Sequence, residues 1–192
     1  CSDTLTISDT TGYTQANWDL DTTLSVAFVN GNTNVGSLND FDVEIVNAST
    51  LVDNVEISVS TVDQFNARGG NDVVDILADV SVQLDGGSGT DTLNGANRTN
   101  TWELNQNAGS YPHQLNTTVE FTAFENLVGN AAVDTFYLNS ATLNGISISG
   151  DDPANITTVT DVLTARFDTS ATWTIQNDDA STTAIETNQV AS

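Results

Sequence analysis

The stretch Gly86-Gly87-Ser88-Gly89-Thr90-Asp91-Thr92-Leu93-Asn94 has the residue types and the spacing of a calcium-binding turn. Its glycines allow a tight turn that exposes backbone carbonyls, and its aspartate adds a carboxylate, so that oxygen ligands preferred by Ca²⁺ come together. The apolar Leu93 would anchor the next strand in the core. A plain acidic turn is the alternative, because a single full match arises easily in a chain rich in Gly and Asp.

Calcium in turns of this kind lies between successive stacked copies, so a second turn is needed. The best candidate lies 19 residues earlier (91 − 72), where Gly70-Asn71-Asp72 and Val74 keep the last glycine, the acid and the apolar anchor. Calcium is therefore the predicted cofactor. The predicted metal ligands are Asp72, Asp85, Gly87, Gly89, Asp91 and Asp151.

Residues that could carry a reaction are few. Adjacent acids occur at Asp151-Asp152 and Asp178-Asp179, but neighbours on a strand point to opposite faces and pair badly for glycoside hydrolysis. Arg68, beside a glycine turn, is the one suggestive basic group for a polysaccharide lyase, and a local charge pair explains it better. His113 has no second histidine to form a metal site. The sequence predicts no catalytic residue and no enzyme.

The charge balance limits the possible partners. There are 26 acids against three basic residues, all of them arginine, and the formal net charge is −23. This balance argues against nucleic acid and anionic membrane surfaces as partners, because binding to either requires a basic footprint. No apolar run is long enough to span a bilayer. Since 38% of the residues are hydrophobic and occur in short alternating runs, we expect a folded chain.

An internal repeat organises the chain. Three similar elements, Asp-Thr-Leu twice and Asp-Val-Leu once, each lead to one of the three tryptophans. The elements begin at Asp3, Asp91 and Asp161, and the tryptophans that follow them are Trp18, Trp102 and Trp173. We therefore expect a single domain over residues 1–192, with copies over about 3–90, about 91–160 and an incomplete 161–192.

The segments between the turns predict strands. Runs such as Val80-Ser81-Val82-Gln83-Leu84 alternate apolar and polar residues with a period of two, and turn signals such as Asp85-Gly86-Gly87 separate them. No sustained helical stripe occurs. The predicted fold class is all-β, and repeats of tens of residues with acidic glycine corners favour a parallel β-solenoid. A β-sandwich is the alternative.

Four segments together resemble a known family. They are Asp85-Gly86-Gly87-Ser88-Gly89-Thr90-Asp91-Thr92-Leu93, Asn100-Thr101-Trp102-Glu103-Leu104, Phe124-Glu125-Asn126-Leu127-Val128-Gly129 and Val133-Asp134-Thr135-Phe136. The set is similar to the repeat of very large bacterial surface and secreted proteins, the adhesin-like, RTX-related β-solenoid proteins. The resemblance is best over residues 82–163. It implies secretion, calcium, and an adhesive or structural role in a matrix, sheath or filament.

The sequence thus predicts a non-enzymatic structural module, secreted or on the bacterial cell surface, stabilised by calcium and self-associating head-to-tail into a fibre. A carbohydrate-binding adhesin domain that stacks exposed Trp and Tyr rings on sugars is the alternative, and a polysaccharide lyase is a third. Cys1, the one cysteine, is either a lipidated first residue or the end of an excised fragment.

Overall fold

The computed structural model describes residues 3–8, 11–21, 24–30, 33–41, 43–58, 62–105, 112–140, 143, 145–150, 161–166 and 184–187. Every regular element within them is a β-strand, and the strands form two sheets, which confirms the all-β prediction. Cys1, Asp151-Asp152, Trp173 and Asp178-Asp179 lie outside the described residues.

The larger sheet, sheet A, has ten strands. Their order is β1 (Thr4–Thr6), β5 (Ile45–Asn47), β7 (Gln64–Asn66), β9 (Val82–Asp85), β13 (Val119–Thr122), β12 (His113–Leu115), β11 (Thr101–Leu104), β15 (Thr135–Leu138), β17 (Val162–Ala165) and β18 (Ala184–Thr187). Sheet B has eight strands. Their order is β16 (Ser147–Ser149), β14 (Asn126–Val128), β10 (Thr92–Asn94), β8 (Val73–Ile76), β6 (Val52–Ile57), β2 (Gln15–Leu20), β3 (Leu24–Asn30) and β4 (Thr33–Phe41).

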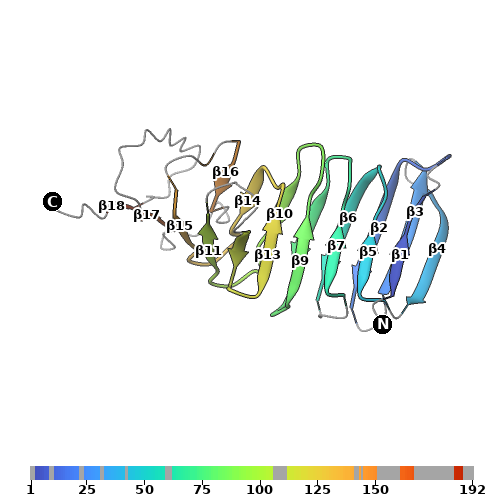
Figure 1. Cartoon of the computed structure of the whole chain (residues 1–192), viewed down its shortest axis with the longest axis horizontal. Helices are drawn as coiled ribbons and strands as arrows, with labels where there is room; N and C mark the ends of the chain where they lie inside the picture. Colours follow the sequence, from blue (N-terminus) through green and yellow to red (C-terminus); the bar gives the residue numbers. More distant parts are fainter. Residues whose placement is uncertain are drawn as a thin grey trace.

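The chain alternates between the two sheets and advances along the long axis of the molecule (Figure 1). From β5 to β10 each strand is followed by one in the other sheet, and each of β5 to β8 pairs in parallel with the strand two places later. Partner positions lie 19 residues apart, as in the hydrogen bond from Asn66 Nδ2 to Asn47 Oδ1. This parallel pairing differs from the antiparallel sheets of an immunoglobulin-like sandwich.

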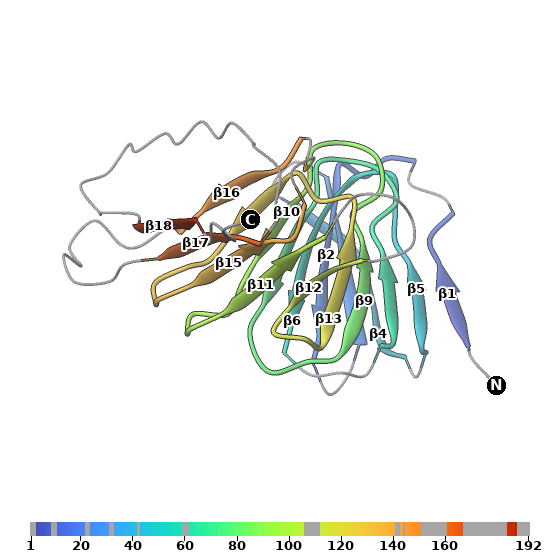
Figure 2. The same cartoon turned by 60° about the vertical axis from the view of Figure 1, so that its left-hand side comes forward.

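Two antiparallel meanders interrupt this alternation. One is β2–β3–β4, which belongs to sheet B, and the other is β11–β12–β13, which belongs to sheet A. Figure 2 shows the second meander inserted between β9 and β15. Sheet A is therefore widened at a point where sheet B has a single strand, β14.

The core lies between the sheets, and the sequence alternation places it there. In β8 the burial pattern makes Val74 and Ile76 buried and their neighbours half-buried, as expected for a strand with one face in the core. Aromatic rings join the sheets. Trp18 of β2 packs edge-on against Phe65 of β7 across the core, with ring centroids 5.4 Å apart.

Candidate functional site

The predicted calcium turn forms a corner between the sheets. It follows β9 in sheet A and leads into β10 in sheet B. The corner that joins β7 to β8 stacks directly against it: the backbone N–H of Ser88 donates to the carbonyl of Arg68 at 2.9 Å, and the N–H of Gly70 donates to the carbonyl of Ser88 at 3.1 Å. The structure therefore brings together the two turns that the 19-residue spacing predicted as partners.

Close stacking explains the glycines of this corner. Gly89 has a φ of +144°, and a Cβ added to it would lie 1.6 Å from the carbonyl oxygen of Gly70. Gly87 has a φ of +90°, and its Cβ would lie 2.2 Å from the carbonyl oxygen of Arg68. No side chain fits at either position, so the approach of neighbouring corners itself requires glycine there.

The acids of these corners form a ladder along the stack. The backbone N–H of Asp53 donates to Oδ1 of Asp72 at 2.8 Å, and the N–H of Asp72 donates to Oδ1 of Asp91 at 2.8 Å. The N–H of Asp91 in turn donates to Oε2 of Glu125 at 2.8 Å. Each carboxylate thus satisfies a buried backbone donor of the neighbouring turn.

A second ladder of the same kind lies at the corner before β15. The N–H of Asn100 donates to Oδ1 of Asp134 at 2.7 Å, and the N–H of Asp134 donates to Oδ1 of Asp161 at 2.8 Å. The acid therefore has the same role in both ladders: an inward-facing carboxylate accepts a backbone N–H of the neighbouring turn where the chain leaves one sheet for the other. The corners before β7 and β9 use backbone carbonyls instead.

Burial changes the acidity of the first ladder. Desolvation raises the pKa of Asp53 to about 6, although the Trp18 ring and Ser49 donate hydrogen bonds to it. Desolvation raises the pKa of Asp72 to about 7, and the carboxylates of Asp53 and Asp91 raise it further. Desolvation also raises the pKa of Asp91. Oδ2 of Asp72 and Oδ2 of Asp91 are buried and meet no hydrogen-bond donor among the described residues.

The other predicted ligands are placed differently. Asp85 is exposed, and its Oδ1 accepts the backbone N–H of Gly87 at 3.1 Å, which closes the turn locally. Asp151 lies outside the described residues. Within the described part of the chain, no group of three or more His, Cys, Asp or Glu side chains is close enough to hold a metal ion.

The two residues weighed for catalysis have structural contacts. Nη1 of Arg68 donates to the carbonyls of Ile7 and Ala48, at 3.1 and 3.4 Å, and so ties three successive turns together. His113 is buried against Phe121, and its Nδ1 accepts the backbone N–H of Asn105 at 3.0 Å. Burial lowers the pKa of His113, which favours the neutral ring that this hydrogen bond requires.

The two described tryptophans provide a matched test of a buried hydrogen bond. Nε1 of Trp18 donates to Oδ1 of Asp53 at 2.8 Å, whereas Nε1 of Trp102 has no acceptor among the described residues. We expect Trp18→Phe to lower the free energy of unfolding by about 1–3 kcal/mol more than Trp102→Phe, because only the first change removes a donor from a buried carboxylate. Urea denaturation of both variants measures the difference, and equal losses would contradict it.

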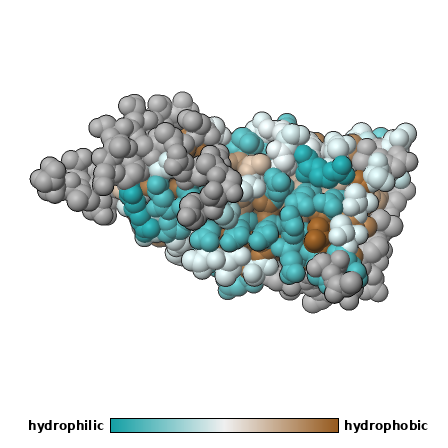
Figure 3. All heavy atoms as spheres, viewed as in Figure 1, coloured by the Kyte–Doolittle hydropathy of each residue, from teal (hydrophilic) through white to brown (hydrophobic). Residues whose placement is uncertain are grey.

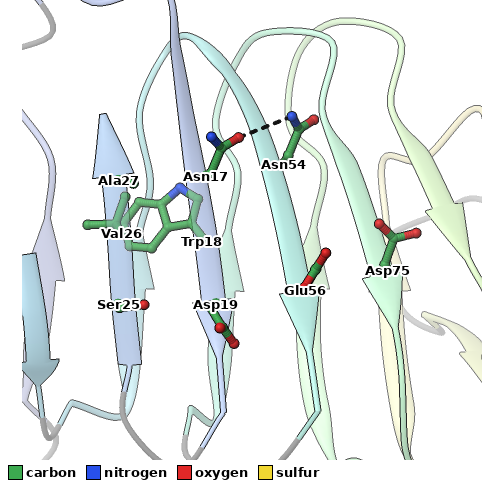
Figure 4. Close-up of a pocket in the computed structure, with 9 residues that line it drawn as sticks. All are labelled: Asn17, Trp18, Asp19, Ser25, Val26, Ala27, Asn54, Glu56 and Asp75. Atoms are coloured by element: carbon green, nitrogen blue, oxygen red, sulfur yellow. Dashed lines mark hydrogen bonds between the residues drawn. The ribbon is translucent and has the colours of Figure 1, made fainter. Parts of the chain in front are cut away.

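The sequence analysis missed a shallow open groove on the outer face of sheet B, with a volume of about 380 Å³ (Figure 4). Asp19, Glu56 and Asp75 occupy one register row across β2, β6 and β8, so three acids line the groove side by side. Asn54 donates to Oδ1 of Asn17 in the row above. Their alternation with core residues was visible in the sequence, but the pairing of strands so far apart was not.

No family model, no curated protein and no solved structure matches the chain. Among the described residues no helix has the length and apolar character needed to cross a membrane.

Proposed function

We propose that the chain is a β-solenoid structural module of a secreted or surface-attached bacterial protein, without enzymatic activity and stabilised by calcium. The observation that supports this proposal is the 19-residue offset shared by paired strands in both sheets and by the stacked corners. Coils that repeat at a fixed offset bury one continuous core, and they make a stiff rod whose stability comes from neighbouring turns.

The outer surface suits a soluble rod rather than a second packed layer. The described part of the face drawn in Figure 3 is mostly hydrophilic. Along the outer face of sheet B, polar side chains stack in register, and Asn94 Nδ2 donates to Oδ1 of Asp75 at 2.6 Å. Such side-chain ladders reinforce the pairing of parallel strands.

Calcium would act through the charge of the corner acids rather than at a preformed site, since no group of three acids among the described residues is close enough to hold an ion. Among these residues, Oδ2 of Asp72 and Oδ2 of Asp91 meet no hydrogen-bond donor, and Asp85 adds an exposed carboxylate to the corner that contains Asp91. A bound divalent cation would neutralise acids that repel one another in a chain of net charge −23. The repulsion between stacked coils would then fall, and the folded state would gain stability.

We expect calcium to raise the thermal midpoint measured by circular dichroism, relative to EDTA at equal ionic strength. Saturation at about 100 times the dissociation constant contributes about 2.7 kcal/mol, which corresponds to a shift of about 5–10 °C for a chain of this size. Asp85→Asn should reduce the shift, and Asp63→Asn, which neutralises an exposed acid that is not a predicted ligand, should retain it. An unchanged midpoint in wild type would contradict the calcium part of the proposal.

The alternatives have less support from the described residues. Trp18 and Trp102 are 2% and 0% exposed, so neither ring is available to stack on a sugar. The guanidinium of Arg68 donates to backbone carbonyls instead of facing the groove. Cleavage of acidic polysaccharides by the purified protein, lost in Arg68→Ala, would replace this proposal with a lyase.

A further inference from the structure

The two meanders of the fold are built alike. In each meander the first strand pairs in parallel with the strand of the same sheet that follows the meander. These pairs are β2 with β6 and β11 with β15. Their registers also agree. Trp18 lies opposite Val26, which lies opposite Leu38, and Trp102 lies opposite Leu115, which lies opposite Val119. Strand β4 therefore occupies in the first meander the position that β13 occupies in the second.

The strand before each meander follows the same correspondence. Strand β1 precedes the first meander and pairs in parallel with β5, and β10 precedes the second and pairs in parallel with β14. The pair β1 and β4 thus corresponds to the pair β10 and β13, with one strand in each sheet.

The two pairs differ at their outer edges. Strand β10 pairs in parallel with β8, placing Leu93 opposite Val74, and β13 pairs in parallel with β9, placing Phe121 opposite Leu84. Strands β1 and β4 instead end their sheets, and no described strand pairs with their outer edges. Both lie at the same end of the molecule in Figure 1. Inside the molecule, therefore, the face formed by β10 and β13 is covered by parallel pairing with β8 and β9.

We propose that the outer edges of β1 and β4 form a docking face for a second copy of this chain, which continues both sheets through parallel strand pairing. This inference rests on the proposed structural role and names the partner of the module. The edge strand β16 of the second copy would pair with β4 in sheet B, and its edge strand β18 would pair with β1 in sheet A.

Strand direction permits this continuation. Parallel pairs link β16 to β2 through β14, β10, β8 and β6, and two antiparallel pairs return β4 to the same direction. In sheet A, the two antiparallel pairs of the second meander likewise leave β18 running in the direction of β1. Both junctions are then parallel, as at β9 and β13, and the contact is heterologous, so that it repeats without closing.

Two of the usual protections against such pairing are absent from these edges. Soluble proteins protect edge strands with lysine or proline, among other devices, but this chain has no lysine, and its two prolines, Pro112 and Pro153, lie outside β1 and β4. The short length of β1, three residues, and the register shifts between β3 and β4 limit the length over which a partner strand can pair. The opposing force is the net charge of −23 on each copy. Salt screens this repulsion, and association should therefore increase with ionic strength.

The backbone of β1 identifies the groups available for docking. The carbonyl of Asp3 accepts the N–H of Ile45, and the N–H of Ile7 donates to the carbonyl of Asn47. Alternate residues of a parallel strand bond to opposite neighbours, so Thr4 and Thr6 direct their N–H and C=O groups away from β5. Proline at Thr4 would remove an outward donor and spare the bonds to β5.

Sedimentation velocity and electron microscopy of the full chain in about 1 M NaCl, where the Debye length is about 3 Å, test this face. We expect wild type to form linear oligomers that lengthen with concentration, and Thr4→Pro to weaken association about tenfold with an unchanged thermal midpoint. Thr4→Val keeps the N–H and should associate like wild type.

Wild type that stays monomeric at every concentration, or Thr4→Pro that assembles like wild type, would overturn the docking face. The proposed structural role fails by a different result, namely cleavage of acidic polysaccharides by the purified protein. The two failures are therefore distinguishable.

Discussion

Gly89→Ala should lower the free energy of unfolding by about 3–5 kcal/mol, because it combines backbone strain with a clash between coils. The φ of +144° is unfavourable for any residue with a Cβ, and the added atom would lie 1.6 Å from the carbonyl oxygen of Gly70. That carbonyl belongs to the backbone of the neighbouring corner, so no side-chain rotation relieves the contact. Relief requires the two corners to separate, which strains the ladder from Asp72 to Asp91.

Gly12→Ala is the matched control for this prediction. Gly12 also has a positive φ, +87°, but a Cβ there meets no atom within 4 Å. Its cost should be limited to the left-handed backbone, about 1–2 kcal/mol. Urea denaturation of both variants isolates the contribution of coil stacking as the difference between them. Equal losses at the two positions would show that the corners are not packed as closely as the structure has them.

The stacking of these corners could be predicted from local sequence. Gly70, Asp72 and Val74 recur 19 residues later as Gly89, Asp91 and Leu93, and the structure pairs Val74 with Leu93 across sheet B. The role of the acid in the fold was also within reach. Asp91 lies two residues before the buried Leu93, and residues i and i+2 of a strand share a face, so its carboxylate had to point inward. The calcium motif predicts Asp91 as a metal ligand, whereas in the structure its carboxylate accepts the backbone N–H of Asp72.

The relation between the tryptophans could not be predicted in full. The sequence equated Trp18 with Trp102, and both do lie on the first strand of a meander. They nevertheless belong to opposite sheets, B for Trp18 and A for Trp102. Each corner moves the chain to the other sheet, so the assignment depends on how many corners separate the two residues. The sequence around each tryptophan does not indicate how many corners lie between them. The repeat boundaries at Asp3, Asp91 and Asp161 stay a prediction.

Trp102→Ala should be the most damaging single truncation in the second meander, with a loss of about 3–5 kcal/mol. The indole is fully buried, stacks on Phe136 of β15 at 5.4 Å with the rings 14° apart, and meets Phe121 of β13 edge-on at 5.9 Å. It therefore packs the meander against β15 on one side and joins β11 to β13 within the meander. Gln114→Ala on β12, whose side chain is half-buried, should cost less than about 1 kcal/mol and serves as the control.

The form of the unfolding transition gives this prediction its sharpest test. If Trp102 couples the meander to its neighbours, its loss should also speed hydrogen exchange in β11, β12 and β13 ahead of global unfolding, since local contacts set local opening. Exchange in β6 and β8 should then follow global stability alone, because these strands belong to sheet B and pair with no strand of the second meander. Equal acceleration of hydrogen exchange in all strands of both sheets would instead mean that the coils unfold as one cooperative unit. Trp102 would then contribute to the global stability of that unit and not to the local stability of the meander.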